Sequence, residues 1–231
     1  MNTPFLKNAL VLGLLSAIGP FAIDMYLPAL PSIGQTLGAS TSGVQASLMA
    51  FFISLGIGQI IYGPISDMMG RKLPLYLGLI LFAVCSVGCA LAPDIQTLIV
   101  LRFLQGLGAS AGMVIPRAVV RDLHTGHDAA RLMSLLMLVF SVSPILAPLA
   151  GSFLIEWAGW RSVFWAVTVP AVMALILLAT SQEETRPPEQ RVDSSVRSAL
   201  QGYGLLLRDR HFLGLVLSLI HISEPTRQAE I

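Results

Sequence analysis

Charge is scarce in this sequence. Of its 231 residues, 12% are Asp, Glu, Lys or Arg, about half of the roughly 25% found in soluble domains. The 14 basic and 13 acidic residues leave a net charge of +1, so there is no basic excess of the kind that binds nucleic acid. The composition argues against a soluble globular domain, and we expect no nucleic-acid partner.

Cysteine and histidine are equally sparse. The two cysteines, Cys85 and Cys89, stand one helical turn apart in an apolar stretch, a spacing that suits neither a disulfide nor a metal site. His124 and His127 have no other metal-ligand types in a suitable pattern beside them. No His-Glu-x-x-His helix, Ser-His-Asp set or phosphate-binding glycine loop is present. We therefore expect no metal, no cofactor and no enzymatic activity, and any energy input would come from an ion gradient.

Hydrophobic residues, in contrast, make up 55% of the chain, and the mean hydropathy is +0.76. A helix needs about 20 mainly apolar residues to cross a bilayer. Six runs meet this length: residues 6–27, 43–63, 73–92, 96–118, 132–155 and 160–180. A seventh run begins near Phe212. The sequence predicts an all-α integral membrane protein.

The cations are distributed unevenly between the loops. With a cytoplasmic N-terminus, a single loop cation, Arg161, lies outside. Eleven lie inside: Lys7, Arg71, Lys72, Arg117, Arg121, Arg131, Arg186, Arg191, Arg197, Arg208 and Arg210. Because cationic loops stay on the cytoplasmic side during insertion, this asymmetry predicts a multi-pass protein with its N-terminus inside. The predicted outer loops cover residues 28–42, 92–95 and 156–159.

The composition changes after the sixth run. Residues 181–191 are polar and cannot bury a core, while apolar residues recur at helical spacing over residues 196–207. We predict a membrane domain over residues 1–181, a cytoplasmic linker with an amphipathic helix on the inner membrane surface over 182–211, and the start of a seventh span over 212–216.

Two charges fall inside the predicted spans, Asp24 in the first and Arg102 in the fourth. A charge in hydrocarbon costs at least about 2.5 to 3.5 kcal/mol, so such residues are functional candidates. Asp24 lies near the outer end of its span and Arg102 roughly 9 Å below the outer surface. They could form an ion pair or line a water-filled cavity separately, and the carboxylate could serve as a proton switch. The structural alternatives are a static ion pair and an arginine that positions helices by bonding to backbone carbonyls.

A short segment between the second and third spans carries a recognisable pattern. We expect it to form an inner loop with glycines at both ends, in which the Asp67 carboxylate accepts hydrogen bonds from a helix N-terminus or an arginine. It resembles the signature loop of the major facilitator superfamily, Gly-x-x-x-Asp-x-x-Gly-Arg-Lys, which is matched by Gly63, Asp67, Gly70, Arg71 and Lys72.

Further segments resemble the same superfamily or its Bcr/CflA branch, which contains drug/proton antiporters. Residues 24–31 are similar to the end of the first helix in that branch, and residues 117–122 are also of the branch's type. Residues 102–108 match the superfamily's fourth-helix pattern of Arg followed by Gln-Gly. Residues 143–152 are similar to the antiporter motif Gly-Pro-x-x-Gly-Gly. Pro148 and Gly151 match that motif, whereas Ala147 and Ser152 replace two of its glycines; with Pro144, the second proline predicts a bent helix.

The resemblance implies the six-helix N-terminal half of a twelve-helix fold in a bacterial inner membrane. It implies proton-coupled efflux of drugs or other small amphiphilic molecules, with Asp24 as the protonated group and Arg102 as its modulator. The missing C-terminal half would be needed for transport, so this fragment alone is expected to be inactive. Candidate cavity residues combine polar tips with deformable apolar surface: Tyr26, Met49, Gln59, Gln105 and Met113. A carrier for a sugar or metabolite and, more remotely, an integral-membrane enzyme are the alternatives.

The end of the chain interrupts the seventh span. Its apolar run stops at His221 after about nine residues, too few to cross a bilayer. Residues 217–227 also resemble a translated sequencing-library adapter, followed by residues consistent with an index and its flank. We therefore expect residues 217–231 to be artefactual and to carry no function.

Overall fold

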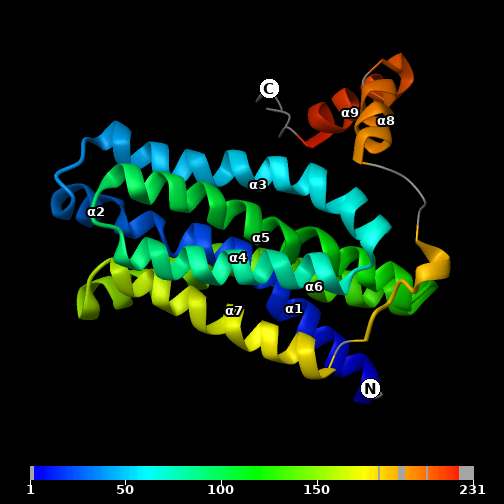
Figure 1. Ribbon diagram of the computed structural model, residues 1–231, viewed down its shortest axis with the longest axis horizontal. Helices are drawn as coiled ribbons and strands as arrows, with labels where there is room; N and C mark the ends of the chain where they lie inside the picture. Colours follow the sequence, from blue (N-terminus) through cyan, green and yellow to red (C-terminus); the bar gives the residue numbers. More distant parts are fainter. Residues whose placement is uncertain (1–2, 182, 192–195, 207, 224–231) are drawn as a thin grey trace, which may run out of the picture. The chain divides into compact units, whose positions relative to one another are not determined.

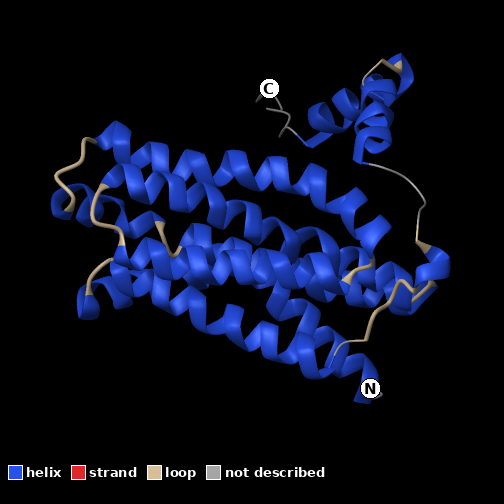
Figure 2. Ribbon diagram, in the orientation of Figure 1, coloured by secondary structure: helices blue, strands red, loops and turns tan. Residues whose placement is uncertain are grey.

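The computed structural model describes residues 3–181, 183–191, 196–206 and 208–223, and every regular element in these ranges is helical (Figures 1 and 2). The chain forms two compact units, Met1–Arg191 and Val192–Ile231. Six helical segments of the first unit are long and apolar enough to cross a membrane. This confirms the all-α membrane fold expected from the sequence.

The first unit is a bundle of long helices joined by tight turns. Its elements are α1 (Thr3–Asp24), the short helices η1 (Leu27–Ala29) and α2 (Leu30–Thr36), α3 (Thr41–Met69), α4 (Lys72–Leu91), α5 (Ile95–Leu123), α6 (Gly126–Ala158), α7 (Arg161–Ser181) and η2 (Pro188–Gln190). Local capping sets several boundaries. The Asp94 carboxylate accepts from the Thr97 N–H at 2.9 Å and starts α5, and Gly159, with φ of 77°, ends α6.

Helix α5 lies at the centre of the packing. It packs most extensively against α3 and α4, while α7 packs on α4 and α1, and α6 packs on α1 (Figure 1). The crossing of α4 and α5 depends on glycine, because a Cβ atom at Gly108 would lie 2.6 Å from the Gly78 carbonyl oxygen. The core is apolar, and large exposed apolar side chains remain on α3 and α6.

Two loop predictions were wrong. Residues 28–42 contain η1 and α2 rather than an open loop, because Pro28 and Pro31 occupy first-turn positions where a proline favours helix. The signature segment is also mostly helical: Gly63 and Asp67 lie in the last turns of α3, which continues through Pro64 to Met69. The loop itself is reduced to Gly70, with φ of 90°, and Arg71.

The second unit contains α8 (Val196–Leu206), where a helix was predicted, and α9 (Arg210–Ser223). Its placement on a membrane surface stays a prediction. Fourteen residues give α9 a length of about 21 Å, less than the roughly 30 Å of a bilayer core. The helix includes the first seven residues of the suspected adapter segment, whose origin stays a prediction that resequencing of the gene would test; residues 224–231 lie outside the described ranges.

Candidate functional site

A buried cation, Arg102, lies inside the bundle on α5. Its side chain is fully buried, and its guanidinium carbon lies 4.3 Å from the ring centroid of Tyr26 and 4.1 Å from that of Phe51. A third ring, that of Phe164 on α7, is 5.9 Å away. Aromatic faces carry negative electrostatic potential, so these rings partly replace the water that the cation has lost.

Hydrogen bonds satisfy part of the same guanidinium. Its Nη1 donates to Gln105 Oε1 at 2.7 Å and to the Ala22 carbonyl oxygen at 3.4 Å, and Gln105 Nε2 donates to Ser86 Oγ at 2.7 Å. Among the described residues, Nε and Nη2 of Arg102 have no hydrogen-bond partner. Arg102 therefore bonds directly to the last turn of α1 and is linked to α4 through Gln105. Its Nε and Nη2 donors are not used.

Asp24 lies at the end of α1 and is half-buried. Its Oδ2 accepts a hydrogen bond from Ser143 Oγ of α6 at 3.3 Å. Within the described ranges no ion pair joins Asp24 to Arg102, although Arg102 contacts the backbone two residues before Asp24. Asp24 and Arg102 thus lie at one level of the bundle, and each has its own hydrogen-bond partners instead of forming an ion pair with the other.

The proline-rich segment of α6 lies against the same end of α1. Pro144 and Pro148 are inside α6, and each removes one helical hydrogen bond. Gly151 is buried, and a Cβ atom there would lie 2.6 Å from the Met25 carbonyl oxygen. The two elements therefore cross at backbone distance one residue beyond Asp24.

The predicted cavity residues occupy different environments. Tyr26 and Gln105 are fully buried in the arginine cluster, and the Tyr26 hydroxyl is 2.5 Å from Ser47 Oγ. Met113 is half-buried and packs against Gly19, whereas Met49 and Gln59 are exposed on α3. The structure therefore brings two of the five together and leaves two on an open helix face.

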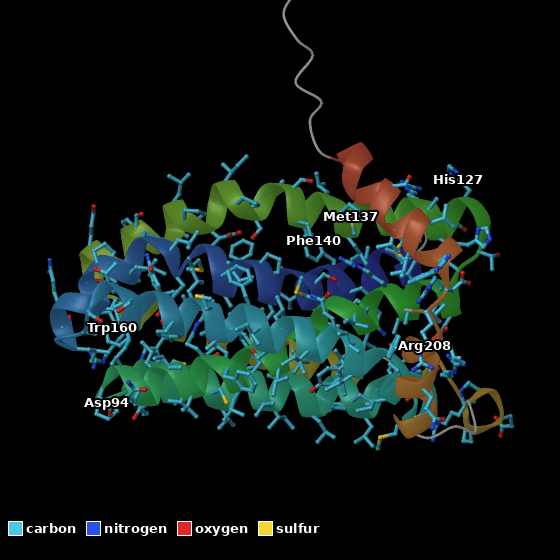
Figure 3. All side chains as sticks on the ribbon, turned by 90° about the horizontal axis from the view of Figure 1, so that it is seen from above. Asp94, His127, Met137, Phe140, Trp160 and Arg208 are labelled. Carbon is cyan, nitrogen blue, oxygen red and sulfur yellow. The ribbon has the colours of Figure 1, made fainter. Side chains whose placement is uncertain are left out.

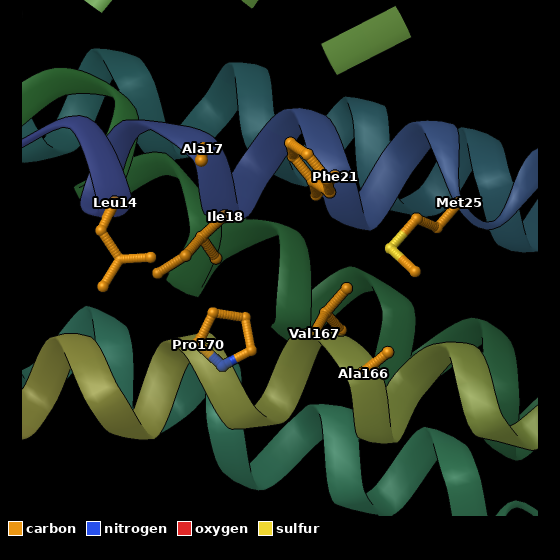
Figure 4. A pocket seen from close by; sticks show the side chains of 8 residues that line it. All are labelled: Leu14, Ala17, Ile18, Phe21, Met25, Ala166, Val167 and Pro170. Carbon is orange, nitrogen blue, oxygen red and sulfur yellow. The ribbon is translucent and has the colours of Figure 1, made fainter. Parts of the chain in front are cut away.

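Neither of the two cavities described in the structure contains these five residues. One, of about 150 Å³, lies between α1 and α7 (Figure 4) and has an apolar lining of Leu14, Ala17, Ile18, Phe21, Met25, Ala166, Val167 and Pro170. The other, of about 480 Å³, lies where α2 meets α3 and is lined by Leu30, Pro31, Gly34, Gln35, Ala39, Thr41, Val44 and Gln45. The apolar cavity lacks the polar groups that would orient a polar ligand.

At the predicted inner end, the signature residues form an ionic network. Arg71 binds Asp67 one turn earlier at 2.7 Å and Asp122 at the end of α5 at 2.7 Å, and it also donates to Ser66 Oγ at 2.8 Å. Arg186, from the segment after α7, binds Asp67 at 2.6 Å. Asp67 therefore has two arginine partners, one in the turn before α4 and one in the segment after α7, whereas an arginine within a neighbouring helix was expected.

The start of α4 is capped by Glu184, which lies in the predicted polar linker and was not predicted to be a site residue. Its two carboxylate oxygens accept from the N–H groups of Arg71 at 2.8 Å and Lys72 at 3.0 Å. Partial burial alone would raise the pKa of this carboxyl. Hydrogen bonds from the N–H groups of Arg186, Arg71 and Lys72, with the charge of Arg191, outweigh burial and hold the pKa below its ordinary value. Segment 183–191 is therefore attached to the signature residues by a charged cap.

Metal-ligand types do not gather in the described part of the chain, where no group of three or more His, Cys, Asp or Glu side chains could hold an ion. The candidate site has two parts. The first is the Asp24 carboxylate, without an ion-pair partner among the described residues, and the buried Arg102 at the same level of the bundle. The second is the ionic network of Arg71 at the predicted inner end. A helical membrane bundle with charges buried in its spans is typical of polytopic membrane transporters.

The chain belongs to the Major Facilitator Superfamily, whose sequence profile matches residues 12–223. It is 44% identical to the uncharacterized MFS-type transporter YdgK of Bacillus subtilis, covering 92% of this chain and 54% of that protein. It is 30% identical to the bicyclomycin resistance protein homolog of Haemophilus influenzae, covering 90% and 52%, and 31% identical to multidrug resistance protein D of Escherichia coli, covering 91% and 52%. The chain thus spans about half the length of these relatives.

Solved structures show the same fold. The inward-open xylose transporter XylE of E. coli matches with a TM-score of 0.70 at 19% identity, over 96% of this chain and 57% of that one. The human organic anion transporter MFSD10 matches with a TM-score of 0.69 at 19% identity, over 86% and 53%. Of the proteins named here, YdgK, XylE and MFSD10 are described as transporters. The six apolar helices and the family match make this chain a multi-pass membrane protein.

Proposed function

We propose that the full-length protein containing this chain is a proton-coupled exporter of drugs or other small amphiphilic molecules in a bacterial inner membrane. The observation that carries the proposal is the half-buried Asp24 carboxylate, which lies in a membrane span without a cationic partner among the described residues. A carboxylate in that position can take up and release a proton as its access to water changes. The names of the bicyclomycin and multidrug resistance relatives support drugs as substrates.

The remaining site residues have supporting roles in this proposal. Arg102 keeps a fixed positive charge at the level of Asp24, which favours loss of the proton. The inner-face network around Asp67 and Arg71 holds the cytoplasmic ends of α3, α4 and α5 together in one of two access states. Protons and a small molecule are then the transported partners, and no cofactor is required.

The second half of the transporter is expected to cover α3. Gly56, Gln59 and Gly63 fall on one side of this helix, and a Cβ atom at either glycine would meet no atom within 4 Å. Glycine and glutamine are poor lipid-facing residues but common where membrane helices pack closely. We infer that this side of α3, with the exposed Met49, packs against the missing C-terminal half and borders the substrate path.

A sugar or metabolite carrier is the second candidate, because the fold matches a xylose transporter. Both candidates are tested in inverted membrane vesicles containing the full-length protein and acidified by respiration. An exporter releases protons from the vesicle lumen when chloramphenicol or bicyclomycin is added, since relatives carry these names. Proton movement upon addition of D-xylose alone would favour the sugar carrier.

We expect Asp24→Asn to abolish drug-induced proton release while leaving the amount of protein in the membrane unchanged. Asp94→Asn is the matched control, because Asp94 is an exposed carboxylate at the start of α5 and asparagine also caps helices. Undiminished proton release by Asp24→Asn would remove Asp24 from the coupling mechanism.

A further inference from the structure

The hydroxyl of Ser143 behaves differently from most other helical serine hydroxyls in the described chain. Ser47, Ser54 and Ser110 donate to the carbonyl three residues earlier, and Ser86 and Ser141 to the carbonyl four residues earlier. Such back-bonding is the ordinary arrangement for serine inside a helix. Ser143 is fully buried and instead donates to Asp24 Oδ2 across the α1–α6 crossing.

The helix around Ser143 offers its hydroxyl a second acceptor. Residue 144 is proline and has no N–H, so the carbonyl of Phe140 loses its usual helical donor. Phe140 is three residues before Ser143, the same spacing at which Ser47 reaches Val44 and Ser54 reaches Phe51. The hydroxyl of Ser143 thus has two competing acceptors, one on each helix.

Few other groups can compete at this position. From α5, the Arg102 guanidinium reaches the Ala22 carbonyl, and the Arg117 guanidinium lies 5.2 Å from the ring centroid of Phe140. Tyr26, in the turn after α1, is bonded to Ser47. The charged and titratable residues of α6 and α7 lie near the helix ends: His127, Asp128, Arg131 and Glu156 on α6 and Arg161 on α7. Helix η1 contains none. Ser143 is therefore the side-chain donor to the Asp24 carboxylate in the described structure.

We propose that Ser143 is a positioning residue that transmits the protonation state of Asp24 to α6. It donates to the ionised carboxylate, drawing α6 onto the end of α1. When Asp24 takes a proton from water, its oxygen becomes a weaker acceptor, and the hydroxyl turns to the Phe140 carbonyl of its own helix. The proline-containing stretch between Ser143 and Gly151 is then free to change its bend against α1. This inference depends on the proposed role of Asp24 and specifies how its proton acts on the helices.

The test measures the titration of Asp24 directly, without a transported substrate. Infrared difference spectra of the purified full-length protein are recorded as a function of pH, and the carboxylic acid C=O band missing in Asp24→Asn is assigned to Asp24. Because a donated hydrogen bond favours the ionised form, Ser143→Ala is expected to move the midpoint of this band up by about 0.5 to 1 pH unit. Alanine is smaller than serine, so the buried site can accept it.

Three further variants separate a switch from a merely structural contact. Pro144→Ala restores an N–H for the Phe140 carbonyl and removes the competing acceptor, so the midpoint is expected to move down. Ser143→Thr keeps the hydroxyl and is expected to retain the wild-type midpoint. Ser141→Ala, two residues away and bonded to its own helix, is the matched control and should leave the midpoint unchanged.

An unchanged midpoint in Ser143→Ala, or shifts of the same sign in Ser143→Ala and Pro144→Ala, would overturn the inference. These outcomes would not affect the proposed function, since Asp24 could still couple transport. Conversely, the midpoint of Asp24 could shift as predicted while the full-length protein moves no protons upon drug addition. That result would contradict the proposed function and leave the role of Ser143 intact.

Discussion

Arg102 is a buried cation whose partners are three aromatic rings, an amide and a carbonyl rather than a carboxylate. Removing a cation from water costs several kcal/mol, a penalty that can exceed what such partners return. We therefore expect Arg102 to contribute to transport rather than to the stability of the bundle. The unpartnered Nε and Nη2 atoms are consistent with a charge that acts on a neighbouring titration rather than as a structural tie.

Replacing this arginine by an apolar residue of similar length should therefore separate stability from transport. For Arg102→Met in the full-length protein we expect an unfolding temperature equal to or a few degrees above that of wild type, together with loss of drug-induced proton release. Thermal unfolding in detergent and the vesicle assay measure the two effects. Arg121→Met, which removes an exposed cation of the same helix, should change neither. A clear drop in unfolding temperature for Arg102→Met would make the arginine a structural residue.

For single residues, the sequence identified the charged side chains in the spans but not the residues that contact them. Asp24 and Arg102 are recognisable because ionisable residues are rare in membrane spans. Ser47 and Ser86 are ordinary residues in a membrane helix, and although Ser143 begins the proline-containing segment 143–152, nothing in the sequence indicates that it contacts Asp24. Their roles depend on which helices cross and at what height, which is a property of the tertiary packing.

At the scale of the helix, the α1–α6 crossing depends on one small residue. The site of a Cβ atom at Gly151 is 2.6 Å from the Met25 carbonyl oxygen, a backbone atom that cannot rotate away. Gly13 faces the same helix pair further along, but there a Cβ atom would lie 4.0 Å from the Val139 side chain, an ordinary contact distance. Gly151→Ala is expected to destabilise the protein by about 1 to 3 kcal/mol.

Gly13→Ala is the control for that change. Since alanine favours helix over glycine, this variant should be neutral or more stable by up to about 1 kcal/mol. Thermal unfolding of both variants in one detergent gives the comparison. Equal unfolding temperatures for the two would mean that α6 does not pack on α1 at Gly151.

The capping of α4 by Glu184 makes a prediction about pH. The pKa of this carboxyl is lower in the folded protein than in the unfolded chain, so its stabilising effect is present above the unfolded value of about 4.3 and is lost as the pH falls through the lowered folded value. At pH 7, Glu184→Gln is expected to cost about 0.5 to 1 kcal/mol, the lower part of the capping range because the group is partly exposed.

The difference between wild type and Glu184→Gln should shrink as the pH is lowered below about 4. Unfolding temperatures measured between pH 7 and pH 3 provide the test. Glu189→Gln, which changes an exposed glutamate in η2, should follow wild type throughout. A difference for Glu184→Gln that persists at pH 3 would show that the carboxylate charge is not the stabilising element.

Across the whole molecule, the six spans could be predicted because hydrocarbon thickness requires long apolar runs, and this requirement acts on sequence directly. Helix ends were less predictable: α3 continues past Gly63 and Pro64, residues that interrupt helices in water but are tolerated where neighbouring helices supply contacts. The cap on α4 was not predictable, since Glu184 is 112 residues from Lys72 in sequence. An apolar run therefore predicts a membrane span, but it does not predict which other segments of the chain pack against that span.

Orientation is the remaining property of the whole molecule that the cation distribution predicts. Asp94 and His127 lie at opposite ends of the helix bundle (Figure 3). The distribution of loop cations assigns the Asp94 end to the outside and the His127 end to the cytoplasm. In a full-length variant without its native cysteines, the buried Cys85 and Cys89 among them, a cysteine introduced by Pro93→Cys should react with a membrane-impermeant maleimide in intact cells. This substitution leaves the helix-capping Asp94 in place. The cysteine introduced by His127→Cys should react only after the membrane is permeabilised, and labelling in the reverse order would place the N-terminus outside.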